Sequence, residues 1–419
     1  MYCSAACRQK AYRERRAEPV DTAEGLIEEV GRQVEALVPQ PPSVFYSGVT
    51  ELSSTVGRLR RIARVARDTA QEAGGERPED FVTGDGVTEV ALTESDFATL
   101  VESYRRELRV HCYRMSGSYD DAEDLVQETF LRAWRARDGF AGRASVRTWL
   151  YRIATNTCLD FQRRTARRPQ RYEPLPGMNH GSAEPPTRIT WLQPYPDEDL
   201  PSAEDQPDTR AVSRETLELV FLAAIQHLPP RQRAVLVLRD VLGLAAAETA
   251  EALDMTVASV NSALQRARPT LRDHLPRRRA DWTAVADTDA REREILKRYM
   301  AAAERLDLSE FATLLSEDIT LTMPPNPFWF VGRAALTEFL KVSLDPASPM
   351  FLGHWRHLPA RANGQLAAGG YVRRPGTTVY RAQVLDVLRI EGDRIVEITS
   401  FEPHLFPAFG LPLRLPADR

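Results

Sequence analysis

The chain has 419 residues, a formal net charge of −4 at pH 7 and a hydrophobic share of 43%. This length allows about two to four domains, and the ordinary hydrophobic share excludes a wholly disordered chain. No run approaches the ~18 apolar residues that would cross a bilayer, and the start lacks the apolar stretch of a signal peptide. The four cysteines, Cys3, Cys7, Cys112 and Cys158, show no disulfide-framework spacing, which fits a reducing cytoplasm. We therefore expect a cytoplasmic protein.

The first block, residues 1–92, opens with MYCSAACRQKAYRERR and continues into two predicted helices. Cys3 and Cys7 look like half of a metal site and resemble the second half of a small zinc ribbon. Structural zinc is held by four ligands, however, and this block contains no histidine. We expect no bound metal here, and we expect that the start is truncated or wrongly placed, or that the block is a remnant of a fused neighbour.

Residues 93–171 are predicted to form three helices that separate acidic from basic side chains. Apolar residues recur at three- and four-residue spacing from Phe97 to Met115, which indicates one buried helical face. The next helix, within GSYDDAEDLVQETFLRAW, is acidic in its first turn, where the helix dipole favours negative charge. It is either an ordinary amphipathic surface or a docking face for a basic partner.

The third of these helices is basic. From Phe140 to Arg171 we count eight arginines against one acid, Asp160. Arginines with interleaved aromatic residues are typical of a surface that binds nucleic acid, because arginines bind phosphates and rings stack on unpaired bases. A solvated charged helix whose aromatic residues belong to the core fits this stretch equally well.

A helix-turn-helix is predicted within residues 213–278, from GLAAAETAEALDMTVASVNSALQRARPTLRDHL. Asp254 is expected to adopt a left-handed conformation in the turn, and Thr256 to cap the second helix. The inward stripe is predicted to be Val257, Val260, Leu264, Ala267 and Leu271. The outward residues, Ser259, Asn261, Ser262, Gln265, Arg266 and Arg268, carry donors and acceptors suited to base edges and phosphates. Pro269 should bend or end this helix. A generic helical hairpin is the less favoured reading.

Two further segments complete the chain. Residues 172–212 form a proline-rich linker with eight acids and one arginine between Glu173 and Asp208, and the apolar start of WLQPYPDEDL predicts that Trp191 and Leu192 dock on a surface. Residues 284–412 open with a helix and then alternate in strand fashion, ending in a hairpin joined by EGDR. We therefore predict a multidomain protein, all-α at first and α+β after about residue 280.

The two helical blocks together resemble regions 2 and 4 of sigma-70 family RNA polymerase sigma factors. The resemblance rests on DAEDLVQETFLRAW and the stretch FAGRASVRTWLYRIATN in residues 93–171, and on LPPRQRAVLVLRDVLGLAAAETAEALDMTVASVNSALQRAR in residues 213–278. It is strongest for the compact extracytoplasmic-function type, which has no globular region 3. The match covers about residues 94–170 and 213–275.

This resemblance implies two partners, promoter DNA and core RNA polymerase, the latter through the β′ clamp helices and the β subunit. It assigns polymerase contacts to Asp121, Asp124, Leu125, Gln127, Glu128 and Phe130. It assigns the melted −10 element, with a flipped base, to Phe140, Arg143, Arg147, Trp149, Asn156, Arg163 and Arg164. It assigns the −35 duplex to Thr256, Ser259, Asn261, Ser262, Gln265, Arg266 and Arg268. The acidic linker would thread the polymerase channel that later holds RNA.

The last block resembles SnoaL-like domains, which are cone-shaped α+β folds, through LLSEDITLTMPPNPFWFVGRAALTEFL and SFEPHLFPAFGLP. The resemblance implies a regulatory extension that acts in place of a separate anti-sigma protein. Acid–base candidates known from enzymes of this fold correspond to Asp318, His354, His357, Asp386 and His404, but the sequence places no pair face to face. The favoured interpretation of these candidates is surface or satisfied polar residues around an apolar cone. The alternative is a cavity for a small apolar ligand, lined by Met323, Trp329, Trp355, Tyr371 and Tyr380.

The leading hypothesis is therefore a sigma factor without catalytic activity or cofactor, regulated by its SnoaL-like C-terminal domain. The alternative is a SnoaL-type enzyme that uses the helical part as a DNA-binding targeting module. Initiation of transcription with core enzyme distinguishes the first from the second, since a targeting module need not start transcription.

Overall fold

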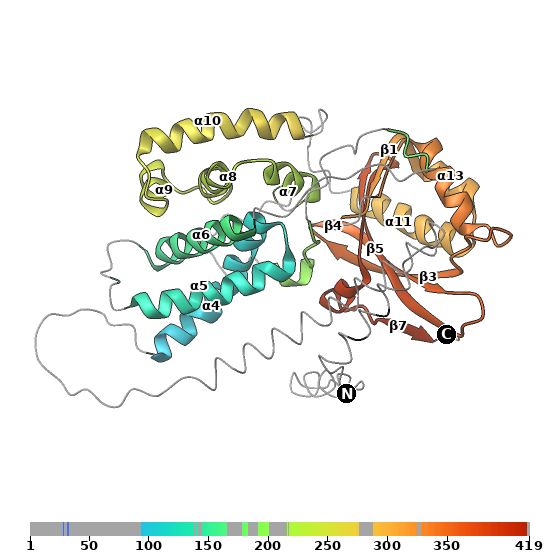
Figure 1. Ribbon diagram of the computed structural model, residues 1–419, viewed down its shortest axis with the longest axis horizontal. Helices are drawn as coiled ribbons and strands as arrows, with labels where there is room; N and C mark the ends of the chain where they lie inside the picture. Colours follow the sequence, from blue (N-terminus) through green and yellow to red (C-terminus); the bar gives the residue numbers. More distant parts are fainter. Residues whose placement is uncertain are drawn as a thin grey trace, which may run out of the picture. The chain divides into compact units, whose positions relative to one another are not determined.

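The computed structural model describes residues 94–137, 140, 145–165, 178–182, 192–200, 216, 218–275, 288–324 and 328–416, together with residues 28 and 32 (Figure 1). The described residues from 94 onward belong to one compact unit, apart from Glu402–His404. Cys3, Cys7 and almost all of the first predicted block lie outside the described residues.

Three helices follow one another where the sequence predicts them: α4 (Glu94–Ser116), α5 (Tyr119–Ala136) and α6 (Val146–Thr165). Helix α5 begins after Ser118, whose Oγ accepts a hydrogen bond from the amide of Asp121 at 3.1 Å. Cys112 and Cys158 are buried in the core of these helices. Burial raises the pKa of the Cys112 thiol, and this makes it an unreactive core residue.

The predicted helix-turn-helix is confirmed. Helices α7 (Leu219–Gln226) and α8 (Pro230–Leu236) precede it, and a π-helical turn, η4 (Val237–Val241), extends α8. The motif itself consists of α9 (Ala246–Ala252) and α10 (Val257–His274), and α10 packs on α8 (Figure 1). Asp254 has a φ of 50°, as expected for the turn. Thr256 caps α10 by accepting a hydrogen bond from the amide of Ser259 at 3.1 Å.

Two details of α10 differ from expectation. The helix does not end at Pro269 but continues to His274, because residues on both sides stay anchored: Ala267 is buried and Leu271 packs on the same core. Val257 was expected to face inward but is 44% exposed. Side chains in a helix tilt toward its N-terminus, so a first-turn residue covers the surface ahead of the helix rather than its packed face.

The C-terminal part is α+β, as predicted. Its helices are α11 (Thr288–Glu304), α12 (Leu308–Leu314) and α13 (Arg333–Leu344). The strands are β1 (Leu315–Thr322), β2 (Trp329–Val331), β3 (His354–Ala362), β4 (Gln365–Arg373), β5 (Val379–Glu391), β6 (Arg394–Phe401) and β7 (Arg414–Pro416). They form one sheet in the order β2-β1-β6-β5-β4-β3, in which β1 and β6 are parallel and β7 pairs with β5. A 3-10 helix, η6 (Pro403–Phe409), follows β6.

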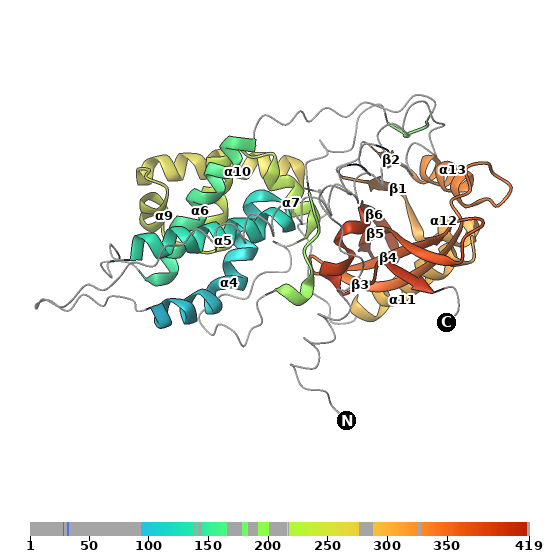
Figure 2. The same ribbon diagram turned by 60° about the horizontal axis from the view of Figure 1, so that its bottom comes forward.

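The sheet is covered on both faces. On one face α11 contacts β3 and β4 (Figure 2), and Tyr299 and Ile295 of this helix share a cluster with Ile319 and Leu388. On the other face Tyr371 contacts Phe406. Burial alternates along the second half of β1, where Ile319 and Leu321 are buried and Thr320 and Thr322 are half-buried. No described helix is long and apolar enough to span a membrane.

Candidate nucleic-acid interface

Helix α10 presents a polar outer face. The residues predicted to contact the −35 duplex are all exposed there: Thr256, Ser259, Asn261, Ser262, Gln265, Arg266 and Arg268. Arg268 is held by Asp240 at the end of α8, with Nε to Oδ2 at 3.0 Å and Nη2 to Oδ1 at 2.9 Å. The face therefore carries hydroxyl, amide and guanidinium groups on a rigid helix, one of them paired with a carboxylate that a phosphate would have to replace.

At the start of α6, aromatic rings and an arginine are fixed by the core beneath them. Phe140 and Trp149 lie with ring centroids 5.0 Å apart. Arg147 donates through Nε to Glu107 at 2.7 Å and lies over the ring of Tyr151. Glu107 also accepts from the Tyr151 hydroxyl, so one buried carboxylate holds both residues. Arg143 lies outside the described residues.

At the end of α6, Asp160 organises the basic side chains. It accepts from Arg132 of α5 at 2.8 Å and from Arg163, and its carbonyl accepts from Arg164 at 3.3 Å. The hydrogen bond from Arg132 and the neighbouring guanidinium charges hold the pKa of the Asp160 carboxyl below its usual range. Asp160 therefore remains ionised and orients arginines that otherwise project into solvent.

The middle of α6 contacts the helix-turn-helix. Asn156 donates to the carbonyl of Ala252 at 3.3 Å, and Arg152 lies 3.3 Å from Asp254 and 3.8 Å from Glu251. One residue predicted for −10 recognition, Asn156, is thus engaged by α9.

The acidic helix α5 divides its predicted polymerase contacts between surface and core. Asp121, Asp124, Gln127 and Glu128 are exposed or half-buried, and Glu128 pairs with Arg132 at 2.7 Å. Leu125 and Phe130 are buried in the core beneath them. Leu131, which sequence reasoning missed, is 43% exposed and is a large apolar side chain on the same helix. The sequence carries no signal for this, because only the packing of α4, α5 and α6 decides which apolar residues of α5 stay exposed.

The linker docks, as WLQPYPDEDL predicts. Leu192 is buried, whereas Trp191 lies outside the described residues. We call Gln193–Asp199 the linker clasp. Gln193 accepts through Oε1 from the Ser118 hydroxyl at 2.9 Å and from the amide of Asp120 at 3.0 Å. The clasp thus binds the N-terminus of α5, beside the predicted polymerase contacts.

The other side of the clasp binds the tight turn between β3 and β4. Asn363, fully buried with a φ of 59°, accepts from the amide of Tyr195 at 2.8 Å and donates to the Tyr113 hydroxyl at 2.9 Å. Its own amide donates to the carbonyl of Tyr195 at 2.9 Å. Asp197 accepts from the amide of Gly364 at 2.7 Å and from Arg361 at 3.2 Å. The turn therefore forms hydrogen bonds with both the backbone and a carboxylate of the clasp.

A second part of the linker lies along the edge strand β2. The amide of Val331 donates to the carbonyl of His180 at 2.9 Å, and His180 Nδ1 donates to the carbonyl of Trp329 at 2.8 Å. The imidazole also stacks on the Trp329 ring, with centroids 4.5 Å apart. Gly181 has a φ of 71° and would bring a Cβ within 1.9 Å of the Val331 carbonyl oxygen, so only glycine fits there.

Two of the acid–base candidates of the C-terminal domain, His357 and Asp386, lie near each other on either side of Tyr299, and the other three are dispersed. Asp318 and His354 are exposed, and His404 pairs with Glu402 at 3.4 Å. Asp386 is buried and accepts from Tyr299 at 2.9 Å and from Ser400 at 2.5 Å. Burial raises the pKa of its carboxyl.

The interior around His357 is filled by its neighbours. A Cβ added at Gly370 would meet Trp355, Val384 and His357 at 3.1 to 3.3 Å. The residues predicted to line an apolar cavity are distributed over both faces of the sheet: Tyr371 and Tyr380 in one cluster, Met323 against the other, Trp355 on His357 and Trp329 on His180. Within the described ranges no three His, Cys, Asp or Glu residues are grouped so as to hold a metal ion.

Comparisons with known proteins agree with this arrangement. Models of Sigma-70 region 2, Sigma-70 region 4 and a SnoaL-like domain match residues 100–168, 218–271 and 296–398. SigG of Mycobacterium tuberculosis, an ECF RNA polymerase sigma factor, is 41% identical over 369 residues, which cover 86% of this chain and 92% of SigG. The chain belongs to the extracytoplasmic-function (ECF) sigma factors.

Two further matches concern SigJ of M. tuberculosis, another ECF sigma factor. Its sequence is 30% identical over 226 residues, covering 54% of this chain and 64% of SigJ. Its crystal structure covers 75% of this chain and 99% of the SigJ chain, with 21% identity and a TM-score of 0.49. As a sigma factor, the protein binds core RNA polymerase and directs transcription initiation at promoters; the SnoaL-type enzyme alternative is not favoured.

Proposed function

We propose that this ECF sigma factor reads the −35 element with the outer face of α10 and the −10 element with α6 and the loop before it. The observation that carries the −35 assignment is the capped helix after a left-handed turn, whose exposed face consists of hydroxyl, amide and guanidinium side chains. Asn and Gln pair with adenine edges and Arg with guanine edges in a major groove. Asn261, Gln265 and Arg266 are the base readers, and Thr256 and Ser259 contact the backbone.

The −10 assignment is supported by the chemistry at the start of α6. A melted strand offers unstacked bases and phosphates, and the Phe140–Trp149 ring pair with Arg147 offers stacking surface and charge. Arg163 and Arg164 are exposed at the other end of the helix, where they contact phosphates. Arg143 belongs to the same site by its place in the sequence.

We further propose that α5 binds the β′ clamp helices through Asp121, Asp124, Gln127 and Glu128, with Leu131 as the apolar contact. Leu125 and Phe130 are buried, so they do not contact the polymerase directly. Instead they pack α5 on the core and thereby position its acidic face. An acidic face of this kind attracts a basic partner surface and sets the association rate more than the final affinity.

The test is run-off transcription with core RNA polymerase on templates bearing defined −10 and −35 elements. We expect the full chain to start transcription, and Asn261→Ala with Gln265→Ala to lose dependence on the −35 sequence. Arg272→Ala, an exposed position on the last turn of α10, is the matched control. A protein that binds the template but never initiates would contradict the proposal.

Regulation by the C-terminal domain is proposed to act through the linker. The clasp is hydrogen-bonded on one side to Ser118 and Asp120 and on the other to Asn363 and Gly364. While it is held there, the linker cannot enter a polymerase channel, and the N-terminus of α5 is covered. Release of the clasp is therefore required for full engagement of core enzyme.

The C-terminal domain is proposed to act without catalysis. The buried Asp386 carboxyl, its best acid–base candidate, is already bonded to Tyr299 and Ser400, and the interior near Gly370 is filled by side chains. General acid–base catalysis needs a group within hydrogen-bond reach of a substrate. A reaction by the full chain that Asp386→Asn abolishes would contradict this.

A further inference from the structure

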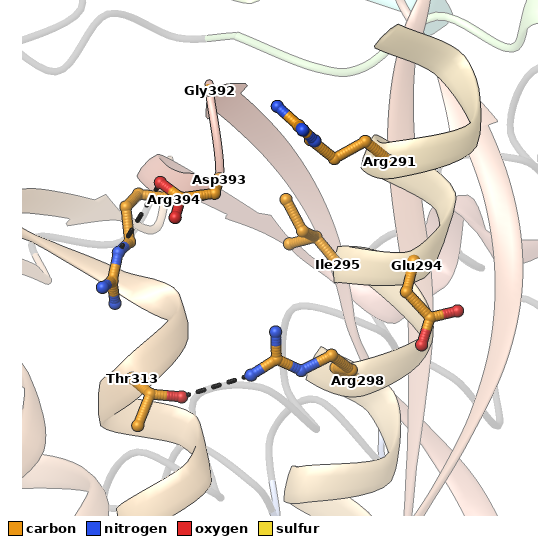
Figure 3. Close-up of a pocket in the computed structure, with 8 residues that line it drawn as sticks. All are labelled: Arg291, Glu294, Ile295, Arg298, Thr313, Gly392, Asp393 and Arg394. Atoms are coloured by element: carbon orange, nitrogen blue, oxygen red, sulfur yellow. Dashed lines mark hydrogen bonds and ion pairs between the residues drawn. The ribbon is translucent and has the colours of Figure 1, made fainter. Parts of the chain in front are cut away.

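The C-terminal domain has an open hollow of about 520 Å³, within the range of about 300–1,000 Å³ of small-molecule sites. Figure 3 shows how three elements form it: one face of α11, the end of α12 and the turn between β5 and β6. Its base includes Ile295, which is 4% exposed, and its rim is charged. It lies apart from α5, α6 and α10, so promoter recognition does not account for it.

Three guanidinium groups surround the hollow, those of Arg291, Arg298 and Arg394. Arg298 is fixed, since its Nε donates to Glu310 at 2.8 Å and its Nη2 reaches Thr313 at 3.4 Å. Among the described residues, Arg394 has only a loose ion pair with Asp393, at 3.8 Å. Arg291 has neither an ion pair nor a hydrogen bond with any residue in the described part of the chain. Most of the donors around the hollow therefore have no partner among the described residues.

Two carboxylates complete the rim, Glu294 on α11 and Asp393 in the turn. In the described part of the chain, Glu294 has no hydrogen bond or ion pair, and Asp393 has only the loose pair with Arg394. The turn backbone is accessible as well, because a Cβ placed on Gly392 would meet nothing within 4 Å. The rim thus offers donors on several sides and acceptors on two, around an apolar base.

We propose that this hollow binds a small organic phosphate that also carries hydroxyl or amino groups, the class to which nucleotides and sugar phosphates belong. A phosphate accepts hydrogen bonds from several guanidinium groups at once, whereas one arginine suffices for a carboxylate. The hydroxyl or amino groups donate to Glu294 and Asp393, and the less polar face of the ligand covers Ile295. The ligand chemistry is polar and anionic, unlike the apolar ligand that the sequence left as an alternative.

The probe is adenosine 5′-monophosphate, titrated into the full chain by isothermal calorimetry at low salt, with adenosine as the phosphate-free comparison. We expect saturable binding of the monophosphate, at least about tenfold weaker binding of adenosine, and a loss of about tenfold or more in Arg291→Ala and in Arg394→Ala. Arg293→Ala is the matched control, because Arg293 is an exposed arginine on α11 that does not line the hollow.

Each outcome of the titration supports or overturns the proposed phosphate site. No saturable binding by the unaltered protein overturns the proposal, as does an equal loss in Arg293→Ala, which would indicate nonspecific charge attraction. Equal affinity for adenosine also overturns it, because the guanidinium groups would then have no role. The measurement needs neither polymerase nor promoter, so its failure leaves the sigma-factor assignment untouched.

Discussion

Replacing Asn363 by glycine should open the linker clasp. Glycine is the suitable replacement, because the φ of 59° at this position would strain alanine. The change leaves the buried amide of Tyr195 without its acceptor, at about 1–3 kcal/mol, and removes a second hydrogen bond worth about 1 kcal/mol. The Tyr113 hydroxyl keeps the carbonyl of Gln193, at 2.7 Å, as its own acceptor.

The clasp should therefore be weakened by about 2–4 kcal/mol, which shifts its opening equilibrium roughly 30- to 700-fold. Hydrogen exchange of the amides in residues 192–200 measures this directly, because local opening sets their exchange rates. Core-polymerase affinity, measured by competition with a labelled sigma factor, should rise in the same variant. Thr377→Gly, at an exposed turn of the same sheet, is the control.

Two results would refute this reasoning. Unchanged exchange of the Tyr195 amide would show that Asn363 does not hold the clasp. Faster exchange together with unchanged or weaker polymerase binding would show that the clasp opens but does not restrain the sigma factor. General unfolding is distinguished by exchange of the α4 core amides, which should stay protected in both variants.

Three further predictions concern the helical regions. Asp124→Arg with Glu128→Arg should weaken core-polymerase binding by about tenfold or more and leave −35 duplex binding intact, as anisotropy would measure; equal core affinity counts against the α5 assignment. Arg266→Ala should cost about 1–3 kcal/mol of −35 binding and relax specificity at one base, whereas a uniform loss across sequences would identify a phosphate contact instead. His111 is buried, and its burial together with the charges of Arg114 and Arg147 lowers its pKa to about 3. Below about pH 6.5 the unfolded chain therefore binds a proton at this histidine that the folded chain does not bind. Stability should fall by about 2 kcal/mol between pH 7 and pH 5 through this group, and His111→Gln should flatten that part of the denaturation profile.

Local sequence patterns were sufficient to predict most of the helices and the helix-turn-helix of this protein. Helical periodicity placed α4, α5 and α6, and the Asp254–Thr256 turn with its polar second helix identified the helix-turn-helix. These features follow from interactions within a few residues of one another, which is why the sequence alone shows them. The same holds for the β5–β6 hairpin, whose turn and alternation are local.

The tertiary structure decided which of those residues are available and what binds the linker. Leu125 and Phe130 of α5 are buried, whereas Leu131 stays exposed. Only the packing of the three helices decides which apolar residues of α5 are covered. The bond between Tyr195 and Asn363 joins residues 168 positions apart, and the hollow around Ile295 brings together α11, α12 and the β5–β6 turn. Periodicity carries no information about such contacts, because they depend on how separate elements meet in space.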